Sequence, residues 1–205
     1  MAHYLRTPSV PNLIVAPKQY DAAYQDKLNN VLRLYFNQLS SLLSVITGVN
    51  GMKYLQLPHG AWYDTTTQTA AAINTAYAVT FNSTTVEDEI TKGTPTSRFY
   101  VPVTGQYNFQ FSLQLSKASG GAAYAWVWPR INGVDVPDSN SKVAVQGTTA
   151  ELVAAWNFIL LMTAGDYFEL MWATNDGIQL LAEAATAFAP AIPSAILTAT
   201  FVSAS

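Results

Sequence analysis

The stretch TGQYNFQFSLQL, residues 104–115, alternates apolar and polar side chains so regularly that it predicts a β-strand. Side chains of a strand point alternately to its two faces, so the two sets separate. One face carries the large apolar residues Tyr107, Phe109, Phe111, Leu113 and Leu115. The other face carries amides and a hydroxyl, namely Asn108, Gln110, Ser112 and Gln114. Because charged residues would solubilise a surface strand better than these, we expect the polar face to meet an uncharged surface.

The same period of two recurs from about residue 54 to the end of the chain. Turn sequences such as Asn132-Gly133 and Asp176-Gly177 separate the segments that follow it. The predicted strands are 60–64, 75–82, 98–103, 106–115, 122–131, 142–147, 151–162, 166–173, 178–184 and 195–202. No helical pattern lies between them, which predicts a mainly β fold, an antiparallel jelly-roll β-sandwich, over residues 51–205.

The one long helical pattern lies upstream of these strands, in residues 18–46. Apolar residues recur there in two interleaved rows at seven-residue spacing, which is the pattern of a coiled-coil seam. The predicted seam residues are Leu28, Leu32, Tyr35, Leu39, Leu42 and Ile46. We interpret residues 18–50 as a helical stalk that ends in the hinge sequence TGVNG, residues 47–51. A helix packed on its own domain is the alternative.

Residues 1–17 contain Pro8, Pro11 and Pro17, which predict an extended segment. The segment also carries apolar side chains that a disordered tail would lack: Tyr4, Leu5, Val10, Leu13, Ile14 and Val15. We therefore expect an anchoring arm that becomes ordered against a partner surface. A disordered leader is the alternative.

The composition excludes several classes of protein. Hydrophobic residues make up 50% of the chain and charged residues 11%, against a usual charged share of about 25%. The net charge of −3 offers no basic surface for nucleic acid. The chain has no cysteine, and its longest apolar run, residues 152–162, is about half of what a membrane span needs. We expect a soluble protein that binds neither nucleic acid nor membrane.

Candidate chemistry is sparse. His3 and His59 are the histidines, and no nucleophile turn accompanies a conceivable pairing of His59 with Asp64. The acidic run 87–89 is typical of a solvated loop, and the carboxylates of the INGVDVPDSN loop do not follow the ligand order of a calcium site. We predict no catalytic residue, no metal ligand, no cofactor and no enzymatic activity.

A row of rings offers a different kind of site. Tyr124, Trp126 and Trp128 alternate with small residues and so share one face of a predicted strand. Such rings fill a core or a subunit interface, or they stack against sugars. Burial is the simpler interpretation and glycan stacking is the alternative.

Two of these stretches resemble a known family. TGQYNFQFSLQL resembles the Gly-x-Tyr-x-Phe-x-Phe strand of C1q/TNF-like jelly rolls, and AGDYFELMW resembles the strand start that follows it in that family. The segments GAWYDTTTQTAAAINTAYAVTFNSTT, INGVDVPDSN and WNFILLMTAGDYFELMWATND are more similar to the C1q-like knobs of bacteriophage virion proteins. The segment APKQYDAAYQDKLNNVLRLYFNQL resembles a lead-in helix of such proteins. The end, PSAILTATFV, departs from the animal pattern, so no ligand-binding residue carries over.

The resemblance implies a homotrimer. It would place Asn108, Gln110, Ser112 and Gln114 against a neighbouring knob, or against water trapped near the threefold axis. The expected function is a phage capsid decoration protein or short head fibre, anchored to the virion surface after assembly in the host cytoplasm. The protein would then bind other copies of itself and phage capsid or tail proteins. A tail fibre whose knob binds a host surface glycan is the alternative, and the missing acid/base pair argues against a glycan-processing enzyme.

Overall fold

The computed structural model describes residues 8–13, 15, 17–47, 57–118, 120–147 and 149–204. The chain separates into two compact units, residues 1–56 and 57–205. Of the positions singled out in the sequence, His3, Tyr4, Leu5, Ile14 and the hinge residues 48–51 lie outside the described residues.

Helix α1 (Ala22–Thr47) covers most of the segment predicted to be helical. The carboxylate of Asp21 caps its start, because Oδ1 accepts a hydrogen bond from the backbone N–H of Ala23 at 2.9 Å. The six predicted seam residues are all half-buried, whereas Leu34, Phe36 and Leu43 are 52%, 58% and 50% exposed. The helix therefore carries more apolar surface than the described residues of its unit cover.

The described arm residues that were predicted to anchor the chain are open to solvent. Val10 is 87% exposed, Leu13 51% and Val15 93%. Their apolar side chains gain nothing from water, so a partner surface for them stays a prediction.

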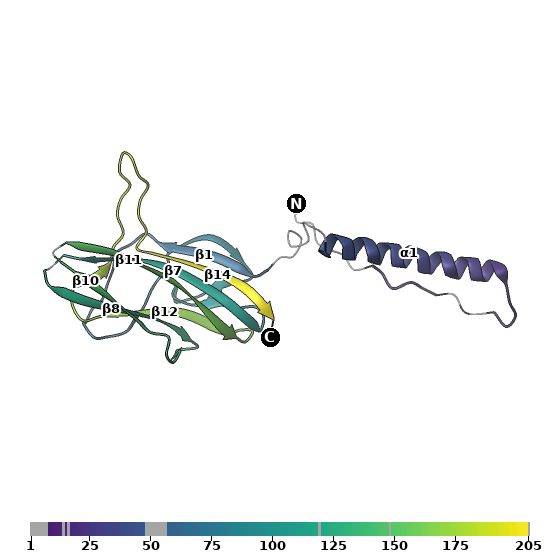
Figure 1. Cartoon of the computed structure of the whole chain (residues 1–205), viewed down its shortest axis with the longest axis horizontal. Coiled ribbons are helices and arrows are strands. Elements are labelled where there is room, and N and C mark those ends of the chain that lie inside the picture. Colours follow the sequence, from purple (N-terminus) through teal and green to yellow (C-terminus); the bar gives the residue numbers. More distant parts are fainter. Residues whose placement is uncertain are drawn as a thin grey trace. The chain divides into compact units, whose positions relative to one another are not determined.

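The second unit consists of two antiparallel β-sheets with the hydrophobic core between them (Figure 1). The first sheet runs in the order β4 (Ser83–Asp88), β1 (His59–Asp64), β14 (Ala195–Ala204), β7 (Gly105–Lys117), β11 (Ala150–Met162). Beyond β14, the same edge of β7 pairs with β13 (Ile178–Leu180), which in turn pairs with β2 (Gln68–Thr69). The second sheet runs in the order β10 (Ser141–Gln146), β8 (Ala122–Ile131), β12 (Tyr167–Thr174), β6 (Phe99–Tyr100), β5 (Thr91–Lys92). Two short strands complete it: β3 (Tyr77–Ala78) beside β12 and β9 (Val134–Asp135) beside β8.

The chain changes sheets repeatedly. It passes from β7 in the first sheet to β8 and β10 in the second, returns to β11, crosses to β12 and ends in β14. Such alternation between two antiparallel sheets is the connectivity of a jelly roll. The predicted fold class is thus confirmed: a jelly-roll β-sandwich preceded by one long helix.

The apolar face of β7 lies in the centre of the core, as the alternation predicted. Tyr107, Phe109 and Leu113 have no exposed surface. The ring of Phe109 stacks on that of Phe168 from the second sheet, with centroids 4.0 Å apart. Each such side chain contributes roughly 1.5–3 kcal/mol through burial. The Tyr107 hydroxyl is satisfied by donating to the carbonyl of Val103 at 2.7 Å.

Three sequence interpretations need correction. The acidic run interpreted as a loop belongs partly to β4, because Glu87 and Asp88 pair with Gly60 and His59 of β1. Glu87 Oε1 also accepts a hydrogen bond from the indole N–H of Trp62 at 2.6 Å, which adds a side-chain contact between the two strands. Of the predicted strand 75–82, the pair Tyr77–Ala78 alone forms β3. Strand β13 ends at Leu180, and residues 181–194 leave the sheet as a hairpin.

Candidate functional site

The outward-facing side of the first sheet is uncharged across its centre. Gln110 lies opposite Asn157 of β11 and Thr198 of β14, and Thr198 lies opposite Ala61 of β1. The next row contains Ala155, Ser112, Ile196, Tyr63 and Ser83 in the same strand order. We call this surface the neutral face. Its residues are Val153, Ala155, Asn157, Ile159, Leu161, Asn108, Gln110, Ser112, Gln114, Ile196, Thr198, Thr200, Ala61, Tyr63, Ser83 and Val86.

The neutral face exposes large apolar side chains alongside its amides. Ile159 and Leu161 on β11 are 62% and 64% exposed, Val153 is 55% exposed and Ile196 39%. Carboxylates stand at its margins: Asp88, whose Oδ2 lies 3.6 Å from His59 Nδ1, at the outer edge, and Glu151 near the start of β11. Exposed apolar patches, such as the adjacent pair Ile159 and Leu161, mark interaction sites on soluble proteins.

The four polar residues predicted to meet a neighbouring knob all belong to this face. Asn108 and Ser112 are half-buried by their cross-strand neighbours, and Gln110 is exposed. The side-chain amide of Asn157 donates to Asn108 Oδ1 at 2.9 Å. The sequence indicated the β7 part of the face but not the apolar part on β11, because the run LVAAWNFILLM hides its alternation.

The predicted aromatic row lies on the outward side of the second sheet. Tyr124, Trp126 and Trp128 are each partly exposed, so they do not belong to the core. Lys142 packs on this row, its Nζ 3.7 Å from the Tyr124 ring centroid and 5.5 Å from that of Trp126. Core burial is thus the wrong interpretation for these rings, whereas a subunit interface and glycan stacking both stay predictions.

Charges surround the aromatic row. Asp135 Oδ1 accepts hydrogen bonds from the Trp128 indole and from Arg130, both at 2.7 Å. The hydrogen bond from Arg130 lowers the pKa of Asp135. Nearby, the buried carboxylate of Glu169 accepts hydrogen bonds from Ser97 and Arg98. The outward sides of the two sheets therefore differ in kind: one neutral and partly apolar, the other charged.

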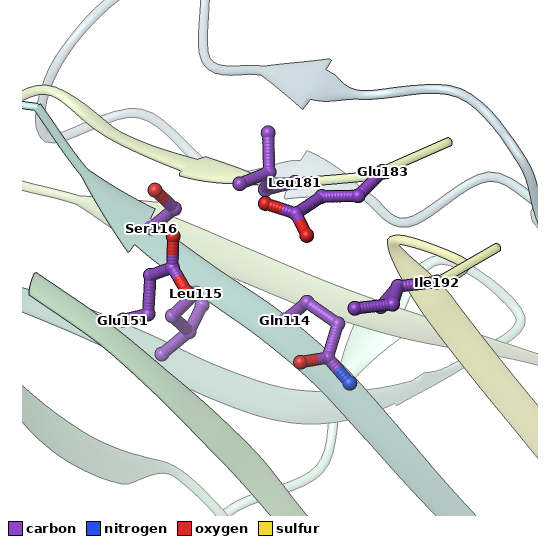
Figure 2. A pocket seen from close by; sticks show the side chains of 7 residues that line it. All are labelled: Gln114, Leu115, Ser116, Glu151, Leu181, Glu183 and Ile192. Atoms are coloured by element: carbon purple, nitrogen blue, oxygen red, sulfur yellow. The ribbon is translucent and has the colours of Figure 1, made fainter. Parts of the chain in front are cut away.

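A small pocket lies where the hairpin 181–194 leaves the first sheet (Figure 2). Its volume is about 30 Å³, and its lining comprises Gln114, Leu115, Ser116, Glu151, Leu181, Glu183 and Ile192. The carboxylates of Glu151 and Glu183 flank it from opposite sides. Within the described residues, no group of three or more metal-ligating side chains comes together. The pocket thus offers no built metal site.

The one pairing considered for catalysis does not form. His59 begins β1 and Asp64 ends it, on opposite faces of that strand. Asp64 is buried in a turn network, accepting hydrogen bonds from Thr66 and from the backbone N–H of Asn82. Its carboxylate therefore stabilises loops and cannot orient the imidazole.

The last residue of β7, Lys117, is a lysine with no exposed surface. Its ammonium donates to the carbonyl of Gly120 at 3.2 Å and lies 2.9 Å from Asp176 Oδ2. The hydrogen bond from Lys117 holds the pKa of Asp176 below its usual range. The sequence carries a signal for this burial, because Lys117 continues the series of odd positions that points inward from Tyr107.

No family model and no curated protein matches this chain. Among solved structures, it is similar to the globular domain of zebrafish complement 1qA protein. The two share 17% identity with a TM-score of 0.46, over 73% of this chain and 99% of that one. The jelly-roll fold is established by the strand order and does not depend on this likeness. In the described part of the chain, no helix is apolar over a length that would cross a bilayer.

We predict that Asp176→Asn lowers the free energy of unfolding at neutral pH, because it leaves the buried ammonium of Lys117 without its counter-charge. A carboxylate whose pKa is depressed on folding stabilises the fold above its unfolded pKa, and this contribution disappears as the pH falls through the folded pKa. The wild type should therefore lose more stability than D176N between neutral and acidic pH. Urea unfolding at several pH values measures this.

The double variant Lys117→Met with Asp176→Asn provides the control, since it removes the buried charge together with its partner. It should recover stability relative to D176N alone. Equal stability of D176N and wild type at neutral pH would show that the ion pair is not a stabilising contact.

Proposed function

We propose that this protein is a homotrimeric, non-enzymatic structural protein of a bacteriophage virion, a capsid decoration protein or short head fibre, in which three knobs pack through their neutral faces. The observation that carries the proposal is the contrast between the two sheets. One outward side exposes Ile159, Leu161 and Val153 without central charges, whereas the other carries Lys142, Arg130 and Asp135. A protein that stayed monomeric would gain from charges on both sides.

Cyclic symmetry explains why such a face lacks charge. Around a threefold axis every side chain lies near two copies of itself, so a carboxylate or ammonium meets like charges at short range. That repulsion is strong once water is excluded. Amides avoid it, because an amide group both donates and accepts hydrogen bonds and so satisfies its own copies.

The helix supports the same stoichiometry. Its second half, residues 34–47, contains no charged residue. Apolar residues also flank the seam on both sides. Phe36 and Leu43 directly follow the seam residues Tyr35 and Leu42, and Val31 and Val45 directly precede Leu32 and Ile46. A stripe this wide suits a bundle in which each helix contacts two neighbours better than the narrow seam of a two-stranded coil. In this proposal residues 18–50 form the stalk.

A short stalk favours a head fibre or capsid decoration protein over a reaching tail fibre. Helix α1 has 26 residues, which span about 39 Å at 1.5 Å per residue. The exposed Val10 and Val15 suit an arm, residues 1–17, that is buried in a capsid surface. The bacteriophage assignment is supported by the sequence resemblance described above, and it implies assembly in the host cytoplasm and residence on the virion surface.

The trimer is tested by Gln110→Glu, which places a carboxylate at the centre of the neutral face with almost no change of shape. We expect the trimer's dissociation constant to rise at least about tenfold, since like charges brought together at an interface cost several kcal/mol. Native mass spectrometry over a concentration series measures this. The matched control is Gln146→Glu, an exposed residue of β10 on the second sheet, which should leave assembly unchanged. Equal assembly of both variants would argue against the neutral face as the interface.

The anchor is tested by deleting residues 1–17. We expect the truncated chain to keep its circular dichroism spectrum and oligomeric state but to be absent from purified particles, because the apolar arm is its proposed contact with the capsid. Quantifying the protein in particles by immunoblot, with full-length chain as reference, measures incorporation. Normal incorporation of the truncated chain would contradict the anchoring role.

The partly exposed rings favour a second candidate function, a tail fibre or receptor-binding tip that binds a host surface glycan. Sugars stack on flat ring faces, and Trp126 and Trp128 offer two beside hydrogen-bonding groups of Arg130 and Asp135. Lys142 covers part of this surface and would have to move aside.

Under this second function, Trp126→Ala should reduce binding of the purified protein to host cells at least about tenfold, because ring stacking supplies much of such affinity. Flow cytometry with labelled protein measures it. Val134→Ala on neighbouring β9, 70% exposed and outside the row, is the control. Unchanged binding of W126A, or no binding by the wild type, would leave attachment to the capsid as the function.

A further inference from the structure

The hairpin 181–194 interrupts what would otherwise be one continuous strand along β7. Leu180 pairs with Leu115 and Ala195 pairs with Leu113, so the chain leaves the sheet and returns to it at the same place. The backbone of Gln114 bonds to both ends of the hairpin. Its carbonyl accepts a hydrogen bond from the N–H of Leu181, and its N–H donates to the carbonyl of Ser194. The pairing of β13 and β14 with β7 therefore does not require residues 181–194.

The hairpin stands on the outward side of the first sheet. Two hollows at its base are lined by outward-facing residues, Gln114 and Glu151 on one side and Tyr63 on the other. Figure 1 shows it as the yellow-green loop that projects from the layer containing β1 and β7. It therefore rises directly from the neutral face.

The hairpin is a preformed structure with an apolar tip. Glu183 and Ile192 exchange backbone hydrogen bonds of 2.9 and 3.0 Å. At the tip, the N–H of Thr186 donates to Ala189, and the Thr186 hydroxyl accepts from the N–H of Ala189 at 3.0 Å. Phe188, held at this turn, is 90% exposed. A rigid hairpin that presents an aromatic ring to solvent loses little conformational entropy when that ring is buried by a partner.

We infer that this hairpin is a clasp between copies of the chain, and that Phe188 packs into a groove on the neighbouring knob. The groove lies between the base of the neighbour's own hairpin and its β1. Its volume is about 160 Å³, and it is lined by Tyr63, Thr65, Glu183, Ala191, Ile192 and Pro193. The inference rests on the proposed trimer.

Symmetry and position both favour a second copy as the occupant. If the neutral faces pack together, an element rising from that face cannot avoid the neighbouring knob. A projecting ring and an apolar groove on one chain form a heterologous contact, which closes into a ring when it is repeated around a threefold axis. Apart from Glu183 at its base, residues 181–194 carry no charge, so the tip that enters the neighbour's groove brings no charged group with it.

Disulfide trapping tests the clasp, because the natural chain has no cysteine. In the full-length double variant Phe188→Cys with Tyr63→Cys, mild oxidation should give a covalent trimer on non-reducing gels. The control pair is Val134→Cys with Tyr63→Cys, since Val134 lies on the second sheet and is 70% exposed. It should stay uncrosslinked. Native mass spectrometry of each reduced variant reports whether its trimer is intact.

A separate variant, Phe188→Ser, should raise the trimer's dissociation constant at least about tenfold without changing the circular dichroism spectrum. An intact trimer that yields no crosslink in F188C/Y63C, together with unchanged assembly of F188S, would overturn the clasp and leave the proposed trimer standing. Crosslinked dimers from Phe188→Cys alone would overturn the groove, because they would show the tips meeting each other. A monomeric wild type would overturn the proposed trimer, and the clasp with it.

Discussion

The alternation of side chains along β7 is the constraint on which the knob depends. This strand is paired along its length with β11 on one edge and with β14 and β13 on the other. Its inward residues stack on the second sheet, as Phe109 does on Phe168. A slip of one residue would exchange the two faces, burying amides and exposing aromatic rings. The register of β7 therefore decides both what forms the core and what the neutral face presents.

The second feature of the knob is an asymmetry of charge between its two sheets. The second sheet satisfies its outward charges within the chain: Arg130 pairs with Asp135, and Glu169 is held by Ser97 and Arg98. The first sheet instead exposes apolar side chains such as Ile159 on its edge strand β11. What the first sheet leaves exposed is apolar surface rather than charge. Association between copies would remove that apolar surface from water, which is favourable.

Local pattern predicted much of this structure correctly. The helix, β8 and the inward face of β7 follow from periodicity, because a half-buried element must match its sequence period to its geometry. Periodicity failed where pairing partners decide the outcome. Edge strand β4 forms because its backbone pairs with that of β1, and Glu87 adds a side-chain hydrogen bond to Trp62, twenty-five positions upstream. The rings from Tyr124 to Trp128 could not be assigned to core or surface, because alternation separates two faces without indicating which is inward.

The sequence by itself determined the class of protein: a jelly roll of low charge behind one long helix, without cysteine and with sparse chemistry. It also determined that one face of residues 106–115 is uncharged. The tertiary structure alone decided that this face continues through Ile159 and Ile196 on neighbouring strands, and that residues 181–194 rise from it. The physical reason is that period and composition are local properties of a chain. The charge and exposure of a surface depend on which distant strands hydrogen bonding brings side by side.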